Sequence, residues 1–434
     1  MRRFLGERSV GIRPLIFERL ENRALLAGNV TTNFSGTGLT ITGDAAANDI
    51  QVSRLANGNW QVKGIATKIN NTNSAPQFAG VTDIAIDLGA GSDIMQITGG
   101  TLPHVLSIND SAGNSTIQLN NFHSLSDIDI TLNTGNNFIS FNNSTSDNQI
   151  NVYTTGGNDT IVATRSGSAS TLINASGSNN DSIVASNCFG GDLEAETVGR
   201  NNHTVITNST VEDGIFSGSS GSSGTNTVAI TGSNAGDGSI AVEGSSGLNI
   251  VTIQNCVSNR DLQLNAPGSS STNNVLSISR VQLGGNLQVT SGDGNDVIAL
   301  SDLNVGGNLS VADSGGNNVV TLVNIHTSGN VKDSIETGDG KDVISVIQFN
   351  SNSNLQITSG GGTDAVVLNQ VDIGENVFSA DVGPGNRDSL TIVNFTAAEM
   401  DILNSGGTDG FLTGAQIHCH DVNIGPNFAH IVGF

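Results

Sequence analysis

The sequence predicts an all-β protein, a single-stranded parallel β-helix (solenoid) of about 15 or more coils with roughly 22–25 residues each. Three observations support this prediction. Apolar residues recur at a fixed period through most of the chain, a second apolar column follows the first two residues later, and a turn rich in Gly, Asn and Asp closes each period. A fixed period of this length is typical of a solenoid, in which each repeat is one coil.

The first column defines the coil, since its members are all apolar and most lie 22 residues apart. It consists of Met95, Ile117, Ile139, Ile161, Ile183, Val205, Val228, Val251, Leu276, Ile298, Val320, Ile344, Val366, Leu390 and Phe411. The second column consists of Ile97, Leu119, Phe141, Ala163, Ala185, Thr207, Ile230, Ile253, Ile278, Leu300, Leu322, Val346, Leu368 and Ile392. Because the residues between the columns are mostly polar, together they predict a strand with one buried face.

Two further patterns predict the other strands of each coil. Apolar pairs such as Ile84/Ile86 and Leu287/Val289 come before each turn and indicate another strand, and single apolar positions such as Phe122 and Phe349 fit a third, short strand. Turns such as residues 291–296 (Ser-Gly-Asp-Gly-Asn-Asp) contain glycine, which adopts the positive φ that tight corners need. Three strands and their corners within about 22–25 residues favour right-handed winding.

Composition favours one continuous solenoid over several globular domains. Glycine contributes 55 of 434 residues, whereas aromatic residues make up 4% and charged residues 13%, which suits narrow stacked coils. We divide the chain into a basic segment (1–27), an N-terminal cap with an enlarged first coil (28–92), the regular solenoid (93–413) and a C-terminal cap (414–434). Residues 54–62 predict a hairpin with the single tryptophan, Trp60, which either covers the first coil or binds a ligand.

The first 27 residues hold six of the sixteen basic residues and lack the sustained apolar core of an ordinary signal peptide. Their end, residues 20–27 (Leu-Glu-Asn-Arg-Ala-Leu-Leu-Ala), resembles the LEPR-XLL segment of large bacterial surface or exported proteins, with Asn22 in place of proline. The resemblance implies export, to the cell surface or the extracellular space. The alternative is a short amphipathic helix that packs on the first coil.

The remaining chain is strongly acidic. Subtracting the three acidic and six basic residues of 1–27 from the totals of 39 and 16 leaves 36 acidic and 10 basic residues, a net charge of about −26. Such a charge argues against a nucleic-acid partner, because phosphate binding needs clustered Lys and Arg. The chain also has no run of about 18 apolar residues, which a transmembrane span would require.

The three cysteines predict no disulfide framework. Cys188 and Cys256 fall in one column three coils apart, about 14 Å, whereas a disulfide needs Cα atoms within about 7 Å. With Thr210 and Ser233 as column neighbours, we expect both cysteines to be small unpaired core residues. Cys419 stands alone.

Calcium is the first ligand that the turns suggest. The turns that lead to Asp93, Asp296, Asp342 and Asp364 have the form G-x-G-x-D, and Asp339 lies inside one of them. They resemble the haemolysin-type (RTX) nonapeptide repeat, in which turn carbonyls and an Asp carboxylate from stacked turns enclose Ca²⁺. Here the motif occurs once per coil, without the nine-residue lattice, and other coils carry Asn274, Asn318, Ser115 or His203 at the Asp position.

The alternative is that these side chains accept hydrogen bonds from backbone N–H groups and stack into a ladder. A second predicted ladder favours this interpretation, since asparagines precede an apolar strand residue in successive coils. Its members are Asn286, Asn308, Asn330 and Asn354.

Candidate chemical groups elsewhere are sparse. Asp127 and Asp129 alternate with core residues and are either a solvated face or the carboxylate pair of a glycosidase. His418 and His420 flank Cys419 and project to one side of a strand, where they could share a transition metal or simply face solvent.

We therefore expect an exported or cell-surface structural or adhesive solenoid without catalytic activity, whose partner is a cell-envelope or extracellular polysaccharide or protein. The alternatives are a polysaccharide-active β-helix lyase or hydrolase, a class that the fold suggests by analogy, and a calcium-binding extracellular repeat module. Calcium is the one cofactor that the sequence suggests.

Overall fold

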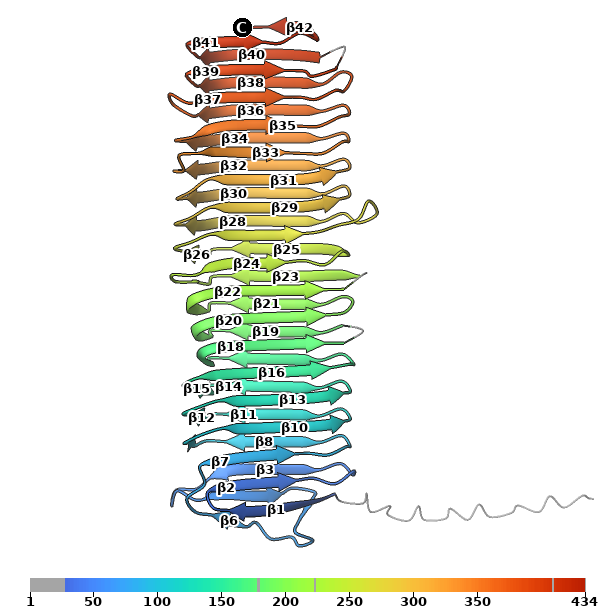
Figure 1. Cartoon of the computed structure of the whole chain (residues 1–434), viewed down its shortest axis with the longest axis vertical. Helices are drawn as coiled ribbons and strands as arrows, with labels where there is room; N and C mark the ends of the chain where they lie inside the picture. Colours follow the sequence, from blue (N-terminus) through green and yellow to red (C-terminus); the bar gives the residue numbers. More distant parts are fainter. Residues whose placement is uncertain (1–27, 178–179, 222–223, 408–409, 434) are drawn as a thin grey trace, which may run out of the picture.

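A computed structural model describes residues 28–177, 180–221, 224–407 and 410–433, and the LEPR-XLL-like segment lies outside this range. The described chain is all-β, without a helix, and forms a parallel β-solenoid of about 16 turns. Figure 1 shows a straight rod that begins at the N-terminal strands (blue) and ends at the C-terminal strands (red). The predicted fold class is confirmed.

Each coil contributes one strand to each of two long sheets, and equivalent strands of successive coils pair in parallel, as Ile108 pairs with Ile130 and Ile117 with Ile139. The first sheet contains β2 (Gly38–Thr42), β7 (Asp83–Asp87), β10 (Leu106–Ala112), β13 (Ile128–Thr134), β16 (Gln149–Thr155), β18 (Gly167–Ser176), β20 (Phe189–Val198), β22 (Thr210–Ser220), β24 (Ser239–Glu243), β27 (Leu262–Ala266), β29 (Leu287–Asp293), β31 (Leu309–Gly315), β33 (Lys332–Glu336), β35 (Asn354–Thr358), β37 (Val377–Asp381), β39 (Glu399–Leu403) and β41 (Asp421–Ile424). The second sheet contains β3 (Asp49–Arg54), β8 (Ile94–Thr98), β11 (Thr116–Asn120), β14 (Phe138–Asn142), β17 (Thr160–Thr164), β19 (Ser182–Ser186), β21 (His203–Thr207), β23 (Thr225–Thr231), β25 (Leu248–Gln254), β28 (Val275–Leu283), β30 (Val297–Val305), β32 (Val319–Thr327), β34 (Val343–Ser351), β36 (Ala365–Asp372), β38 (Ser389–Thr396), β40 (Gly410–His418) and β42 (Phe428–Val432).

The predicted third strand is present as a short element. It is separate in β9 (Thr101–Leu102), β12 (His123–Ser124), β15 (Thr145–Ser146) and β26 (Val257–Ser258), and in later coils it forms the end of a long strand such as β30. The corner before it holds a residue with positive φ, for example Asn121 (φ 53°), Asn143 (φ 52°) and Asp302 (φ 54°). Asn and Asp tolerate this left-handed conformation better than most side chains, which accounts for their recurrence at the corner.

The core is the interior of the rod, where inward residues of both sheets are buried while outward residues are partly or fully exposed. The predicted columns are confirmed except at two coils. The buried residues there are Thr204 and Ile206 in place of Val205 and Thr207, and Leu412 in place of Phe411, which is 43% exposed. These coils depart from the assumed spacing by one residue, and a slip of one residue exchanges the two faces of a strand.

Cys188 and Cys256 are buried and unpaired, as expected. The column neighbour of Cys188 is Ser209, not Thr210, because the Cys188 N–H donates to the Ser209 hydroxyl at 3.1 Å. Cys419 is free and partly buried.

The N-terminal part folds back on itself to cover the first coil. The predicted hairpin is present, since β3 pairs antiparallel with β4 (Trp60–Gly64), which continues to β6 (Gln77–Phe78). β1 (Asn29–Ser35) pairs antiparallel with β2 and parallel with β5 (Lys68–Ile69). Trp60 is only 1% exposed and packs against Phe122, with ring centroids 6.2 Å apart. Its ring therefore belongs to the packed interior and not to a ligand site.

Residues 414–434, which we expected to form a cap, include strands that continue the solenoid. β41 pairs in parallel with β39, and β42 pairs in parallel with β40. The coil pattern therefore extends past residue 413, with Val422 and Ile431 about half exposed (44% and 49%).

Candidate functional site

The turn aspartates that suggested calcium lie in a buried ladder inside the rod. In each coil a backbone N–H donates to the side-chain oxygen of the equivalent residue in the next coil. The bonds run from Asn48 to Asp93 (2.7 Å), Asn137 to Asp159 (2.8 Å), Asp159 to Asp181 (3.0 Å), Asn274 to Asp296 (2.6 Å), Asn318 to Asp342 (2.8 Å), Asp342 to Asp364 (2.9 Å) and Asp364 to Asp388 (2.9 Å). This geometry is the one that the capping interpretation predicts.

The five predicted calcium ligands do not converge on one point. Asp93, Asp296, Asp342 and Asp364 are at most 2% exposed, whereas Asp339 is exposed in the outer turn and accepts a hydrogen bond from the Gly361 N–H at 3.1 Å. Within the described residues no group of three or more His, Cys, Asp or Glu side chains could hold a metal ion. His203 was also assigned wrongly to the ladder, because Asn202 occupies that position and accepts from the Asp181 N–H.

Burial has a marked electrostatic effect on the ladder. It raises the pKa of Asp93 to about 6 and that of Asp364 to about 7, and it also raises the pKa of Asp296 and Asp342. The cause is the removal of a carboxylate from water, which disfavours the charged form. The second carboxylate oxygens of Asp93 and Asp342 are buried without a hydrogen-bond partner among the residues that the structure describes.

The predicted asparagine ladder is present in part. The Asn308 N–H donates to Asn286 Oδ1 at 2.9 Å, and the Val377 N–H donates to Asn354 Oδ1 at 3.0 Å. Asn330 is displaced from the ladder, since Lys332 pairs opposite Asn354. The register therefore differs at this coil.

The same coil buries a carboxylate that the sequence analysis missed. Asp333 is 0% exposed at a position equivalent to the core residue Leu355. Its Oδ2 accepts hydrogen bonds from the hydroxyls of Thr327, Ser351 and Ser353, and its Oδ1 accepts one from the Leu309 N–H. A fully hydrogen-bonded carboxylate of this kind is structural.

The remaining predicted side chains lie on the surface. His418 and His420 are exposed and project from the C-terminal coil. Asp127 Oδ1 accepts a hydrogen bond from Asn148 Nδ2 at 2.6 Å, and Asp129 Oδ1 accepts one from Asn151 Nδ2 at 2.9 Å. Both aspartates thus hold neighbouring coils together on a solvated face.

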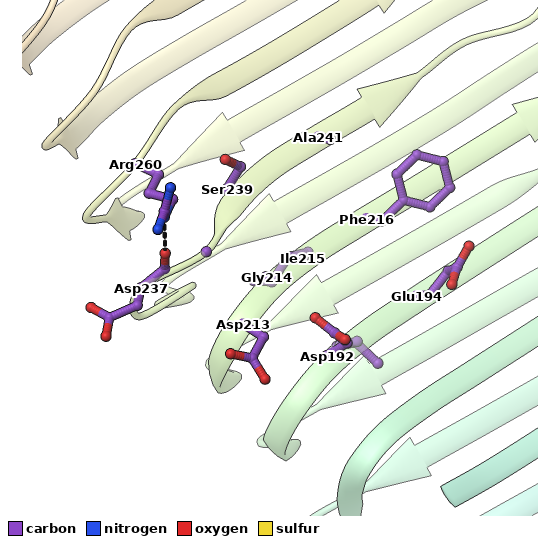
Figure 2. Close-up of a pocket in the computed structure, with 12 residues that line it drawn as sticks. Asp192, Glu194, Asp213, Gly214, Ile215, Phe216, Asp237, Ser239, Ala241 and Arg260 are labelled. Carbon is purple, nitrogen blue, oxygen red and sulfur yellow. Dashed lines mark hydrogen bonds between the residues drawn. The ribbon is translucent and has the colours of Figure 1, made fainter.

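A groove that the sequence analysis missed lies on the outer face of the first sheet. It has a volume of about 680 Å³ and crosses β20, β22 and β24. The side chains that give it chemical character are Asp192, Glu194, Asp213, Phe216, Asp237 and Arg260. Figure 2 shows Asp192 and Asp213 next to each other near the turns, with Glu194 and the Phe216 ring farther along the strands.

Glycines make room for the two neighbouring carboxylates. Asp192 pairs opposite Gly214, and the pairing of β20 with β22 is irregular between Gly190 and Asp192. A Cβ atom at Gly214 would lie 3.9 Å from Asp192 Oδ1, and one at Gly191 would lie 3.2 Å from Asp213 Oδ2. Each carboxylate therefore extends over a glycine of the neighbouring coil, where a side chain would fill the groove.

The groove combines acidic groups with one anchored cation. Burial and the nearby Asp213 raise the pKa of Asp192, and burial and the nearby Glu196 raise that of Glu194. Arg260 Nε donates to the Asp237 carbonyl oxygen at 2.6 Å, which fixes the guanidinium at the rim (Figure 2). The arrangement offers several acceptors, one set of donors and the face of an aromatic ring.

The sequence contains a weak signal of this groove. Asp192, Asp213 and Asp237 follow one another at intervals of 21 and 24 residues, so each coil contributes one carboxylate. A search for alternating acidic residues within one strand overlooks a site that is assembled across coils.

None of the described segments is a helix long and apolar enough to cross a membrane. Comparisons of the chain with protein-family models, with curated proteins and with solved structures give no match. The site must therefore be interpreted from its own geometry.

Proposed function

We propose that the protein is an exported structural or adhesive β-solenoid without catalytic activity, which binds an extracellular or cell-envelope polysaccharide in the groove of the first sheet. The observation that carries the proposal is the groove itself, in which Asp192, Glu194 and Asp213 lie beside the ring of Phe216. Export is inferred from the resemblance of residues 20–27 to the LEPR-XLL segment.

The chemistry of the groove suits a sugar chain. Carboxylates accept hydrogen bonds from sugar hydroxyls, and the Arg260 guanidinium can donate to ring or hydroxyl oxygens. The half-buried Phe216 ring offers an apolar surface for the C–H face of a pyranose. A neutral or amino-substituted polysaccharide fits this acidic groove better than a uronic acid polymer, because like charges repel.

A glycan array with the full chain tests the proposal, followed by calorimetry with the best oligosaccharide. We expect Glu194→Gln or Phe216→Ala to weaken binding at least about tenfold, because each removes a contact within the groove. Asp129→Asn is the matched control, since it changes an acidic residue of the same sheet outside the groove. Failure to bind any glycan, or equal binding by the groove variants, would refute the proposal.

The second candidate is a polysaccharide-active enzyme, which one observation favours. The raised pKa values of Asp192 and Glu194 are those of carboxyls that hold a proton, beside the Asp213 carboxylate. A protonated carboxyl with a neighbouring carboxylate is the pair that glycoside hydrolysis uses. Release of new reducing ends from the bound glycan, abolished by Asp213→Asn, would establish this function in place of passive binding.

The third candidate is a calcium-dependent module. The observation in its favour is the unpartnered second oxygen of Asp93 and of Asp342, which a cation could satisfy.

A further inference from the structure

The outer face of the second sheet lacks charged side chains over most of the rod. The strands concerned are β8, β11, β14, β17, β19, β21, β23, β25, β28, β30, β32, β34, β36 and β38. Along their straight parts, before the corner residue with positive φ, none of the described outward side chains is Asp, Glu, Lys or Arg. We call this surface the uncharged face. His203 on β21 is the one titratable side chain among its described outward positions.

An apolar column runs along this face. Val275, Val297, Val319 and Val343 pair in register on four successive coils and are 42%, 41%, 39% and 38% exposed. The other outward positions of these strands are mainly small residues such as Ser277, which leave the surface flat. Contiguous exposed apolar residues of this kind mark an interaction surface.

The rest of the molecule restricts what can lie on this face. The chain without residues 1–27 has a net charge of about −26, and the outer face of the first sheet carries acidic residues such as Asp129, Glu194 and Asp381. Two copies that meet through any acidic surface repel each other, whereas the uncharged face offers an approach without opposed carboxylates.

The available area is sufficient for a stable contact. Fourteen strands at about 4.8 Å spacing give a length of roughly 65 Å, and five residues at about 3.3 Å give a width of roughly 16 Å. The resulting area of about 1,000 Å² per copy exceeds the roughly 800 Å² per partner of a standard stable interface. Two flat sheets pack about 10 Å apart with their outward side chains interleaved.

We propose that the uncharged face binds the same face of a second copy of this chain, so that two acidic rods pack side by side with their first sheets and grooves facing outward. The inference does not depend on the polysaccharide proposal, because the groove lies on the opposite sheet. A side-by-side dimer would present two grooves to a long polymer.

Sedimentation velocity of the full chain tests the dimer, and small-angle X-ray scattering tests its geometry. We expect a concentration-dependent dimer whose cross-section increases while its length stays that of one rod. Raising the salt concentration should strengthen the dimer, because salt screens the repulsion between acidic copies. A monomer at about 100 μM, or a dimer twice as long as the monomer, would overturn the proposal.

Substitutions locate the contact. Val297→Glu with Val319→Glu places like charges against each other across the interface, and we expect the dimer Kd to rise at least about 100-fold. Gln288→Glu with Ser310→Glu is the matched control, because these outward residues lie in the same region of the first sheet and should leave the dimer intact. Thermal melts establish that each variant is folded. If the Val variant does not fold, Thr321→Glu at a polar outward position of the uncharged face provides the second test. Equal dimerisation of a folded uncharged-face variant and the control would refute the assignment.

Discussion

The two sheets of the rod enclose one core but differ on their outer faces. Inward residues such as Leu287 of the first sheet and Ile298 of the second are equally buried. Outside, the first sheet carries a groove with several carboxylates, whereas the second is uncharged from β8 to β38. Stacking requires only an apolar interior and paired backbones, so it leaves both outer faces free to vary. The difference between them therefore indicates different tasks, and we assign ligand binding to one and self-association to the other.

The largest expected effect concerns the interior that the two sheets share. Leu287→Asp and Ile298→Asp each place a carboxylate in the core, and we expect each to lower the free energy of unfolding by at least about 4 kcal/mol. Ala299→Asp, one residue beyond Ile298 and outward, should change stability by less than about 0.5 kcal/mol. Chemical denaturation measures all three. A similar loss in the inward and outward variants would show that the faces are assigned incorrectly.

A smaller effect is expected at the ladder, which lies in the corner between the two sheets. Asp364→Ala leaves the Asp342 N–H without its acceptor, and we expect a loss of about 1–3 kcal/mol in unfolding free energy. Asp364→Asn retains an accepting oxygen and should lose less than about 1 kcal/mol. Asp339→Ala, at an exposed turn position one coil away, is the control and should be nearly neutral. Equal losses for Ala and Asn would contradict the capping role.

The ladder also predicts how stability depends on pH. Burial raises the pKa of Asp181 to about 6, of Asp364 to about 7 and of Asp313 to about 8, from an ordinary value of 3.8. The folded state therefore binds these protons more tightly than the unfolded state, so this stabilisation is complete below about pH 4 and is lost as pH rises through 6–8.

We accordingly expect the melting temperature to fall between pH 5 and pH 9, measured at constant ionic strength. Asp313→Asn should flatten the curve, because it removes the carboxyl with the highest of these pKa values while adding no charge. A melting temperature that rises over the same range would contradict the assignment. The exposed Asp129 gives a matched Asp→Asn control that should leave the slope unchanged.

The inner architecture could be predicted from the sequence because the core accepts almost only apolar residues with a period of two along each strand. Ile117 and Leu119 illustrate this, since both are 0% exposed. The prediction failed where coil length changes by one residue. Thr204 lies 21 residues after Ile183, and counting 22 selects the outward Val205 instead. Asn330 failed for the same reason, because Lys332 occupies its expected position.

The groove could not be predicted in this way. Its carboxylates come from three coils at unequal spacings, and they lie together only because Gly191 and Gly214 leave space above the sheet. Asp333 was missed because the surrounding Thr and Ser hydroxyls that accept a carboxylate in the core come from different strands. Side chains on separate coils become neighbours only once the register of each coil is known.

The smallest expected effect concerns calcium and separates ladder from ligand site. If Asp342 and Asp364 serve as backbone caps, millimolar Ca²⁺ should leave the melting temperature of the full chain within about 1 °C of that in chelator, and calorimetry should detect no saturable heat. Saturable binding that is lost in Asp342→Ala and in Asp364→Ala would instead assign the unpartnered Asp342 oxygen to a cation. Mg²⁺ at equal concentration controls for screening of the acidic surface, because a purely electrostatic effect would not distinguish the two ions.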